Sequence, residues 1–208
     1  MNSLVQVLKA LDALWNRATE AFERIREAYP DLVRCKRGCD DCCHGVFDLS
    51  PVEVLGVGVG FAHLPRADRR ELLRRAGAVA RAFDELVGRA GRLEPERALE
   101  LVSQARIRCA LLETDGCALY QWRPVTCRLY GVPVAIAGAS RVCHLSGFVR
   151  GENYPAVDLA KFQNELEELS ILACRLMPAL GPVRLDMGRA LRWAADHRLA
   201  LARLGRRG

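Results

Sequence analysis

Apolar side chains recur at steps of three and four residues along most of this chain, which is the pattern of amphipathic helices. The longest such stretch covers residues 3–29 and ends before Pro30, and similar apolar stripes cover residues 67–90 and 156–176. A short helix is expected over residues 95–105 and a last helix near residues 184–204. The pattern predicts a mainly helical protein whose apolar stripes face a shared core.

A further helix is predicted to begin at Pro51, because Ser50 and Glu53 form a capping box around a proline at the first helical position. Glycine occupies every second position over residues 56–60 of this helix. The spacing does not match the dinucleotide-binding fingerprint, and no strand is predicted before it. We interpret the glycines as positions where the helix backbone packs closely against a neighbour.

Two segments between the helices lack a helical pattern. Residues 31–48 look irregular, while residues 107–120 flank an Asp-Gly pair and predict a β-hairpin. A short helix or turn carrying Cys127 is expected after Pro124, and one short strand is expected near residues 132–136.

These expectations define the predicted fold class and domain organisation. The fold class is mainly α, a single helical domain over residues 1–208 with a small β-hairpin and irregular cysteine-rich metal-binding loops. The cysteine-cluster core spans residues 35–145, between the N-terminal helix 3–29 and the C-terminal helices over 156–204.

Composition narrows the classes of function. Half of the 208 residues are hydrophobic, so the chain can bury a core without relying on crosslinks. Lys9 and Asp12 interrupt the apolar start that a signal peptide needs, and no segment approaches the roughly 20 apolar residues that span a bilayer. We therefore expect a cytoplasmic protein with no membrane partner. The net charge of +6 comes without a dense basic run interleaved with aromatics, so nucleic acid is not expected as a partner.

Cysteine is the most informative residue type in this sequence. Four thiols lie within nine residues in the order C-x3-C-x2-C-C, and four more follow singly. In a reducing compartment such clusters bind metal or perform redox chemistry more often than they form structural disulfides. The eight predicted metal ligands are Cys35, Cys39, Cys42, Cys43, Cys109, Cys117, Cys127 and Cys143. The ninth, Cys174, is expected to be buried and inert within helix 156–176.

Cys127 has a particular context. Pro124 places it near a helix N-terminus, where unpaired N–H groups favour an anion. Arg123 and Arg128 flank it and add positive charge. Each effect is expected to lower the pKa of the Cys127 thiol.

The cysteine spacing, together with Cys117-Ala-Leu-Tyr and the run Arg123-Pro-Val-Thr-Cys-Arg128, resembles the YkgJ-like cysteine-cluster family over residues 35–145. That family is described as zinc- or iron-chelating domains, so the resemblance implies a bound metal. Ala110 departs from the pattern, where a proline is expected, and so does the first three-residue spacing. Flagellin lysine methylases share a similar pattern, which implies methyl transfer to a protein substrate as an alternative.

Two metals fit eight thiolates. A [4Fe–4S] cluster takes four cysteines and is favoured by the spacing, while Zn²⁺ in one or two four-ligand sites is the alternative. His44 and His144 each follow a cysteine and are weighed as substitute ligands, although an ordinary polar role is preferred for both.

Three functions follow from these residues. The preferred one is a metal-binding cysteine-cluster protein that holds an iron–sulfur cluster or zinc. The alternatives are a metal-dependent protein-modifying enzyme, as the methylase resemblance implies, and a thiol redox sensor. No acid/base pair, no nucleophile beside a base and no nucleotide motif stands out, so no catalytic or organic-cofactor residue is assigned.

Overall fold

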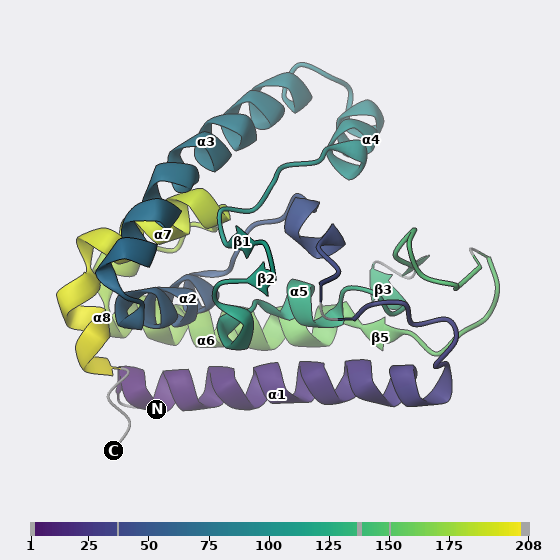
Figure 1. The fold of residues 1–208 in the computed structure, drawn as a ribbon, viewed down its shortest axis with the longest axis horizontal. Helices are drawn as coiled ribbons and strands as arrows, with labels where there is room; N and C mark the ends of the chain where they lie inside the picture. Colours follow the sequence, from purple (N-terminus) through teal and green to yellow (C-terminus); the bar gives the residue numbers. More distant parts are fainter. Residues whose placement is uncertain (1–2, 37, 137–138, 150, 205–208) are drawn as a thin grey trace.

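The computed structural model describes residues 3–36, 38–136, 139–149 and 151–204, and its main class is helical, as predicted. Helix α1 runs along one side of the molecule, α2 and α6 pack against it, and α3 with α4 forms an arm that rises away from it (Figure 1). Within the described ranges, no helix combines the length and the apolar character that crossing a membrane requires.

The long outer helices form where their apolar stripes predict them. Helix α1 spans Leu4–Ala28, and the Ser3 hydroxyl caps it by accepting a hydrogen bond from the Gln6 amide. Helix α6 spans Leu159–Leu176, with Asp158 as its capping residue. It begins three residues after the predicted start because residues 157–158 pair as a strand instead.

Helix α2, Pro51–His63, is the centre of the fold. Every residue from 51 to 62 is buried, because α1, α6, α7 and α8 all pack around this helix. The glycines allow this packing: a Cβ added at Gly56 would lie 2.6 Å from Trp15 Cη2, and one at Gly60 would lie 2.6 Å from Trp122 Cγ. The close-packing interpretation of these glycines is confirmed.

The remaining helices complete the arm and the C-terminal layer. Helices α3, Arg66–Ala90, and α4, Pro95–Gln104, match their predictions within about one residue. The single helix predicted over 184–204 is wrong, because α7, Met187–Asp196, ends before α8, Arg198–Leu204, begins. The two meet at His197, whose ring stacks on Trp193 and whose Nδ1 lies 2.8 Å from the Trp193 carbonyl oxygen.

The β-structure is small. Strands β1, Leu112–Glu113, and β2, Gly116–Cys117, form the hairpin, but the predicted strands over 107–111 and 118–120 are wrong. Residues 107–109 bond to the first cysteine segment instead, as described below. A second sheet has the order β4-β3-β5 and includes the predicted strand β3, Val134–Ile136. Its other strands, β4, Ala139–Arg141, and β5, Val157–Asp158, were not predicted.

Candidate metal centre

Five thiols from four separate segments gather around Cys42, and we call them the inner group. They are Cys42, Cys43, Cys109, Cys117 and Cys127. The Cys42 thiol is hydrogen-bonded to the thiols of Cys43 and Cys127, and Cys109 and Cys117 lie close enough to interact with it electrostatically. The predicted ligands from both halves of the cysteine pattern thus meet at one place.

The other predicted ligands form an outer group of Cys35, Cys39 and Cys143. The Cys35 thiol is hydrogen-bonded to that of Cys39 and also interacts with Cys42, so the outer group adjoins the inner one. All three outer thiols line a solvent-connected cavity of about 330 Å³. Cys174 lies apart from both groups, on α6, where its thiol donates to the Gly181 carbonyl oxygen at 3.0 Å.

A short helical turn presents the first two inner thiols. The 3-10 helix η1, Asp41–His44, carries Cys42 and Cys43 on consecutive positions. Its carbonyls are paired across the chain, since the Cys109 amide donates to the Cys43 oxygen at 2.7 Å and the Ile107 amide donates to the His44 oxygen at 3.1 Å. This backbone pairing brings Cys109 beside Cys43, and it explains why residues 107–109 do not join the hairpin.

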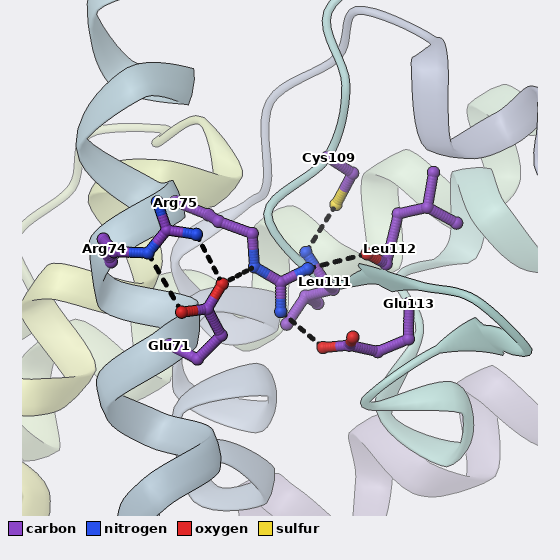
Figure 2. Close-up of polar contacts among 7 residues, drawn as sticks. All are labelled: Glu71, Arg74, Arg75, Cys109, Leu111, Leu112 and Glu113. Atoms are coloured by element: carbon purple, nitrogen blue, oxygen red, sulfur yellow. Dashed lines mark hydrogen bonds and ion pairs between the residues drawn. The ribbon is translucent and has the colours of Figure 1, made fainter.

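An arginine from α3 holds the segment that follows Cys109. Figure 2 shows the Arg75 guanidinium between Glu71 of the same helix and strand β1. It donates to the Leu112 carbonyl oxygen at 2.7 Å and forms an ion pair with Glu113. The arm helix α3 thereby fixes the start of the hairpin next to a candidate ligand.

Backbone amides donate to several of the sulfurs. The Leu111 amide lies 3.5 Å from Cys109 Sγ, two residues after the cysteine (Figure 2). The same arrangement recurs with the Leu119 amide at Cys117 and the Leu145 amide at Cys143. Hydrogen bonds of this kind stabilise thiolates and tune the potential of thiolate-bound iron.

Helix α5, Val125–Leu129, carries Cys127, and a buried carboxylate fixes its start. Glu53 of α2 accepts hydrogen bonds from the Val125 amide at 2.9 Å, the Ser50 amide at 3.2 Å and the Ser50 hydroxyl at 3.0 Å. Burial raises the pKa of the Glu53 carboxyl, and these hydrogen bonds reduce that shift. Glu53 therefore ties the first turn of the central helix to the first turn of the ligand-bearing helix.

Among the inner thiols, Cys42 is the one that loses its proton most readily. Hydrogen bonds from the Cys127 and Cys43 thiols, aided by the charge of Arg123, hold the pKa of the Cys42 thiol far below its ordinary value. The pKa values of Cys43 and Cys127 are raised, chiefly by the same hydrogen bonds and by burial. The expectation that Cys127 carries the lowered pKa is therefore wrong, because Cys127 donates to the thiolate.

The two arginines that flank Cys127 have different roles. Burial raises the pKa of the Cys35 and Cys117 thiols, and the charge of Arg123 reduces that rise. The same charge helps to lower the pKa of Cys42. Arg128 points to α1, where it donates to the Thr19 hydroxyl at 3.0 Å and lies over the Trp15 ring. It also donates to the carbonyl oxygens of Arg123 and Gln121, and so fixes the loop before Cys127. Burial lowers the pKa of the Arg128 guanidinium to about 10.

A carboxylate is the centre of polar contacts beside the outer group. Asp41 is 3 % exposed, and its Oδ2 accepts hydrogen bonds from the Tyr130 hydroxyl at 2.8 Å and the Cys143 thiol at 3.5 Å. Its Oδ1 pairs with Arg106. Burial raises the pKa of this carboxyl, but the hydrogen bonds from Tyr130 and Arg106 outweigh burial and leave the pKa below its ordinary value.

The sequence interpretation missed two of these residues. Asp41 was not assigned a role, and Glu53 was identified only as part of a capping box. The Tyr130 hydroxyl, which donates to Asp41, was not assigned a role either. The two histidines also differ: the His44 ring bonds to the Asp40 carbonyl oxygen, whereas His144 Nδ1 lies 3.6 Å from Asp41 Oδ2.

Comparison of the chain with known proteins found no relative. No family model matches it, no curated protein matches it, and no solved structure matches it. The resemblance to the YkgJ-like family thus stays a prediction.

Proposed function

We propose that this protein is a metal-binding cysteine-cluster protein and that the inner group holds its metal centre, with an iron–sulfur cluster favoured over zinc. One observation carries the proposal: Cys42 Sγ is hydrogen-bonded to the thiols of both Cys43 and Cys127, which come from segments 84 residues apart. Cys109 and Cys117 adjoin the same sulfur.

The donor set fits a soft metal. Thiolates select zinc, cuprous copper and iron–sulfur clusters, and both a structural zinc and a [4Fe–4S] cluster take four of them. The inner group contains five thiols, so either centre leaves one to spare or to share with Cys35 and Cys39 beside it. The amides that donate to Cys109 and Cys117 favour sulfurs that carry negative charge.

The surroundings of these sulfurs favour the binding of a cation. Burial raises the pKa of the Cys109 thiol to about 12, so a proton must be displaced when a metal binds there. Arg123 offsets part of the negative charge that gathers as several thiols lose protons. Glu53 and Arg75 hold α5 and β1 in place, which preorganises ligands that lie far apart in sequence. When bound, an iron–sulfur cluster supplies one-electron transfer, and zinc supplies structural crosslinking.

The test is the metal content of the intact protein purified without oxygen. We expect iron and sulfide in about a four-to-four ratio per chain for the cubane type. Cys42→Ser should lose the centre, whereas Cys174→Ser, a cysteine outside both groups, should retain it. Zinc without sulfide would support the zinc alternative. Equal metal content in the Cys42→Ser variant and the wild type would overturn the proposal.

A thiol redox sensor is the second candidate, and the lowered pKa of Cys42 favours it. The Cys42 thiolate can attack hydrogen peroxide to give a sulfenic acid and one water, and the Cys127 thiol can then displace a second water to form the Cys42–Cys127 disulfide, so that two electrons pass from sulfur to the peroxide. The two functions separate clearly in one assay. A sensor would be purified without metal and would lose two free thiols per chain on treatment with peroxide, reversibly with dithiothreitol.

A further inference from the structure

Three different donor types meet at the edge of the outer group. The side chains of Asp41, Cys143 and His144 place one ligand atom each within 4.8 Å of the others. Asp41 comes from η1, while Cys143 and His144 follow strand β4, so the two segments are 102 residues apart where they touch. Oxygen, sulfur and nitrogen together are a mixed donor set, unlike the all-thiol inner group.

The two distances from the Asp41 carboxylate match a tetrahedral site. Zinc binds sulfur at about 2.3 Å and nitrogen or oxygen at about 2.0–2.2 Å, so two ligand atoms at a tetrahedral angle lie roughly 3.4–3.6 Å apart. Asp41 Oδ2 lies 3.5 Å from Cys143 Sγ and 3.6 Å from His144 Nδ1. Both edges that meet at the carboxylate oxygen therefore have the length that a four-coordinate ion requires.

Other residues hold these ligands in position. Asp41 is buried, with Tyr130 donating to Oδ2 and Arg106 paired to Oδ1, so its carboxylate cannot rotate freely. The Leu145 amide donates to the Cys143 sulfur, as the Leu111 amide does to Cys109. Outer partners of this kind orient metal ligands and strengthen binding.

Two of the three donors are accessible to solvent. Cys143 and Tyr130 line the cavity of about 330 Å³, and the His144 side chain is 66 % exposed. Zinc sites whose ligands are all protein side chains are structural, whereas sites with three protein ligands keep a position for water or substrate. Three protein donors, of which Cys143 lines the cavity and His144 is exposed, correspond to the second kind.

We propose that Asp41, Cys143 and His144 form a second metal site, separate from the inner centre, that takes a borderline divalent cation such as Zn²⁺ and leaves one position open to the cavity. Binding displaces the Cys143 thiol proton to solvent. The inference goes beyond the proposed function, because it assigns a carboxylate and a histidine and does not require an iron–sulfur cluster.

The experiment compares His144→Asn with His44→Asn in the full-length protein. Both histidines directly follow a cysteine, but only His144 lies beside Asp41, since the His44 ring bonds to the Asp40 carbonyl oxygen. Each protein is titrated with Co²⁺ and with Zn²⁺ after its resident metal has been measured. We expect His144→Asn to weaken one Zn²⁺ equivalent by at least about tenfold to a hundredfold and to abolish the ligand-field absorption of tetrahedral cobalt. His44→Asn should match the wild type.

Two further variants sharpen the result. Tyr130→Phe removes the outer hydrogen bond to Asp41 while every proposed ligand stays in place, and it should weaken the same equivalent by about tenfold or more. Cys143→Ser should remove the charge-transfer absorption of the cobalt–thiolate bond. Equal Zn²⁺ affinity in His144→Asn and the wild type would overturn the proposal, and so would a loss confined to Cys143→Ser, which would indicate a thiolate-only site.

Different measurements test the outer site and the inner metal centre. Iron and sulfide, or tightly held zinc, report the inner centre and should be equal in His144→Asn and His44→Asn. If the inner group proves metal-free, the proposed function fails, and the difference between the two histidine variants still decides the outer site.

Discussion

The contact between α2 and Trp122 leads to a quantitative prediction about Gly60→Ala. A methyl group at Gly60 would lie 2.6–2.9 Å from three atoms of the Trp122 indole. The movement of the ring is limited, because the Trp15 ring packs edge-to-face against it with the centroids 6.3 Å apart. The substitution should therefore push Trp122 and the segment that leads to Cys127.

The expected change in stability of Gly60→Ala is the sum of two opposing contributions. Overpacking of a filled core costs about 1–3 kcal/mol, while replacing glycine by alanine inside a helix gains up to about 1 kcal/mol. Gly77 in α3 supplies the matched control, since a Cβ there meets only Arg81 Nη1 at 3.5 Å, an ordinary contact. The propensity gain is common to both variants, so Gly60→Ala should be less stable than Gly77→Ala by about 1–3 kcal/mol.

Urea unfolding of the two variants measures this difference, and thermal unfolding should show it as about 2–4 °C per kcal/mol for a chain of this length. Metal content measured in parallel should fall in Gly60→Ala and stay unchanged in Gly77→Ala. Equal stability of the two variants would refute the reasoning, because it would mean that α2 and Trp122 do not pack as the structure shows.

Three further predictions concern residues that position the cysteines. Burial raises the pKa of the Glu53 carboxyl above its unfolded value, so the free energy of unfolding of the wild type should fall as pH rises through the folded-state pKa. Glu53→Gln should reduce this fall, as measured by urea unfolding from acid to neutral pH. An equal pH dependence of stability in the variant and the wild type would contradict the prediction. Arg128→Lys cannot keep all three of its hydrogen bonds and should lose about 1–3 kcal/mol, measured by urea unfolding. Gly131→Ala combines a φ of +104° with a Cβ 2.7 Å from that of Cys35. It should destabilise the protein more than Gly38→Ala, whose φ is +90° with open space around it, as thermal unfolding would show.

The sequence predicted the helices well because their signals are local. The apolar stripe of α1 and the capping box before α2 are read from residues that lie within a few turns of one another. The break at His197 was missed because the residues of α7 and α8 all favour a helix. The hydrogen bond between the His197 ring and the Trp193 carbonyl oxygen produces no pattern of apolar residues that the sequence would show. The length of the hairpin was wrong because residues 107–109 pair with carbonyls more than 60 residues away.

The sequence indicated two groups of candidate ligands, one in the first cysteine segment and one around the hairpin and Cys127, but not which thiols meet. The structure places the thiols of Cys43 and Cys127 in hydrogen-bonding contact with Cys42. The sequence could not indicate that Cys143 lies against Asp41, because that contact depends on how strand β4 joins a sheet that was only partly predicted. The charge of Cys127 was misjudged for a similar reason, since the sequence does not show that its proton is directed to Cys42.

Because α2 is buried from residue 51 to residue 62, hydrogen exchange at its amides can report whether a metal is bound at the cysteines. Amides of a fully buried helix exchange with solvent only when the whole molecule opens, so their exchange rate reports global stability. A cation that binds the native state alone slows that opening, by about a hundredfold when its concentration is 100 times its Kd. Helix α2 contains none of the candidate ligands, yet deuterium uptake at its amides would report the filling of a site that α2 supports through Glu53 and Gly60.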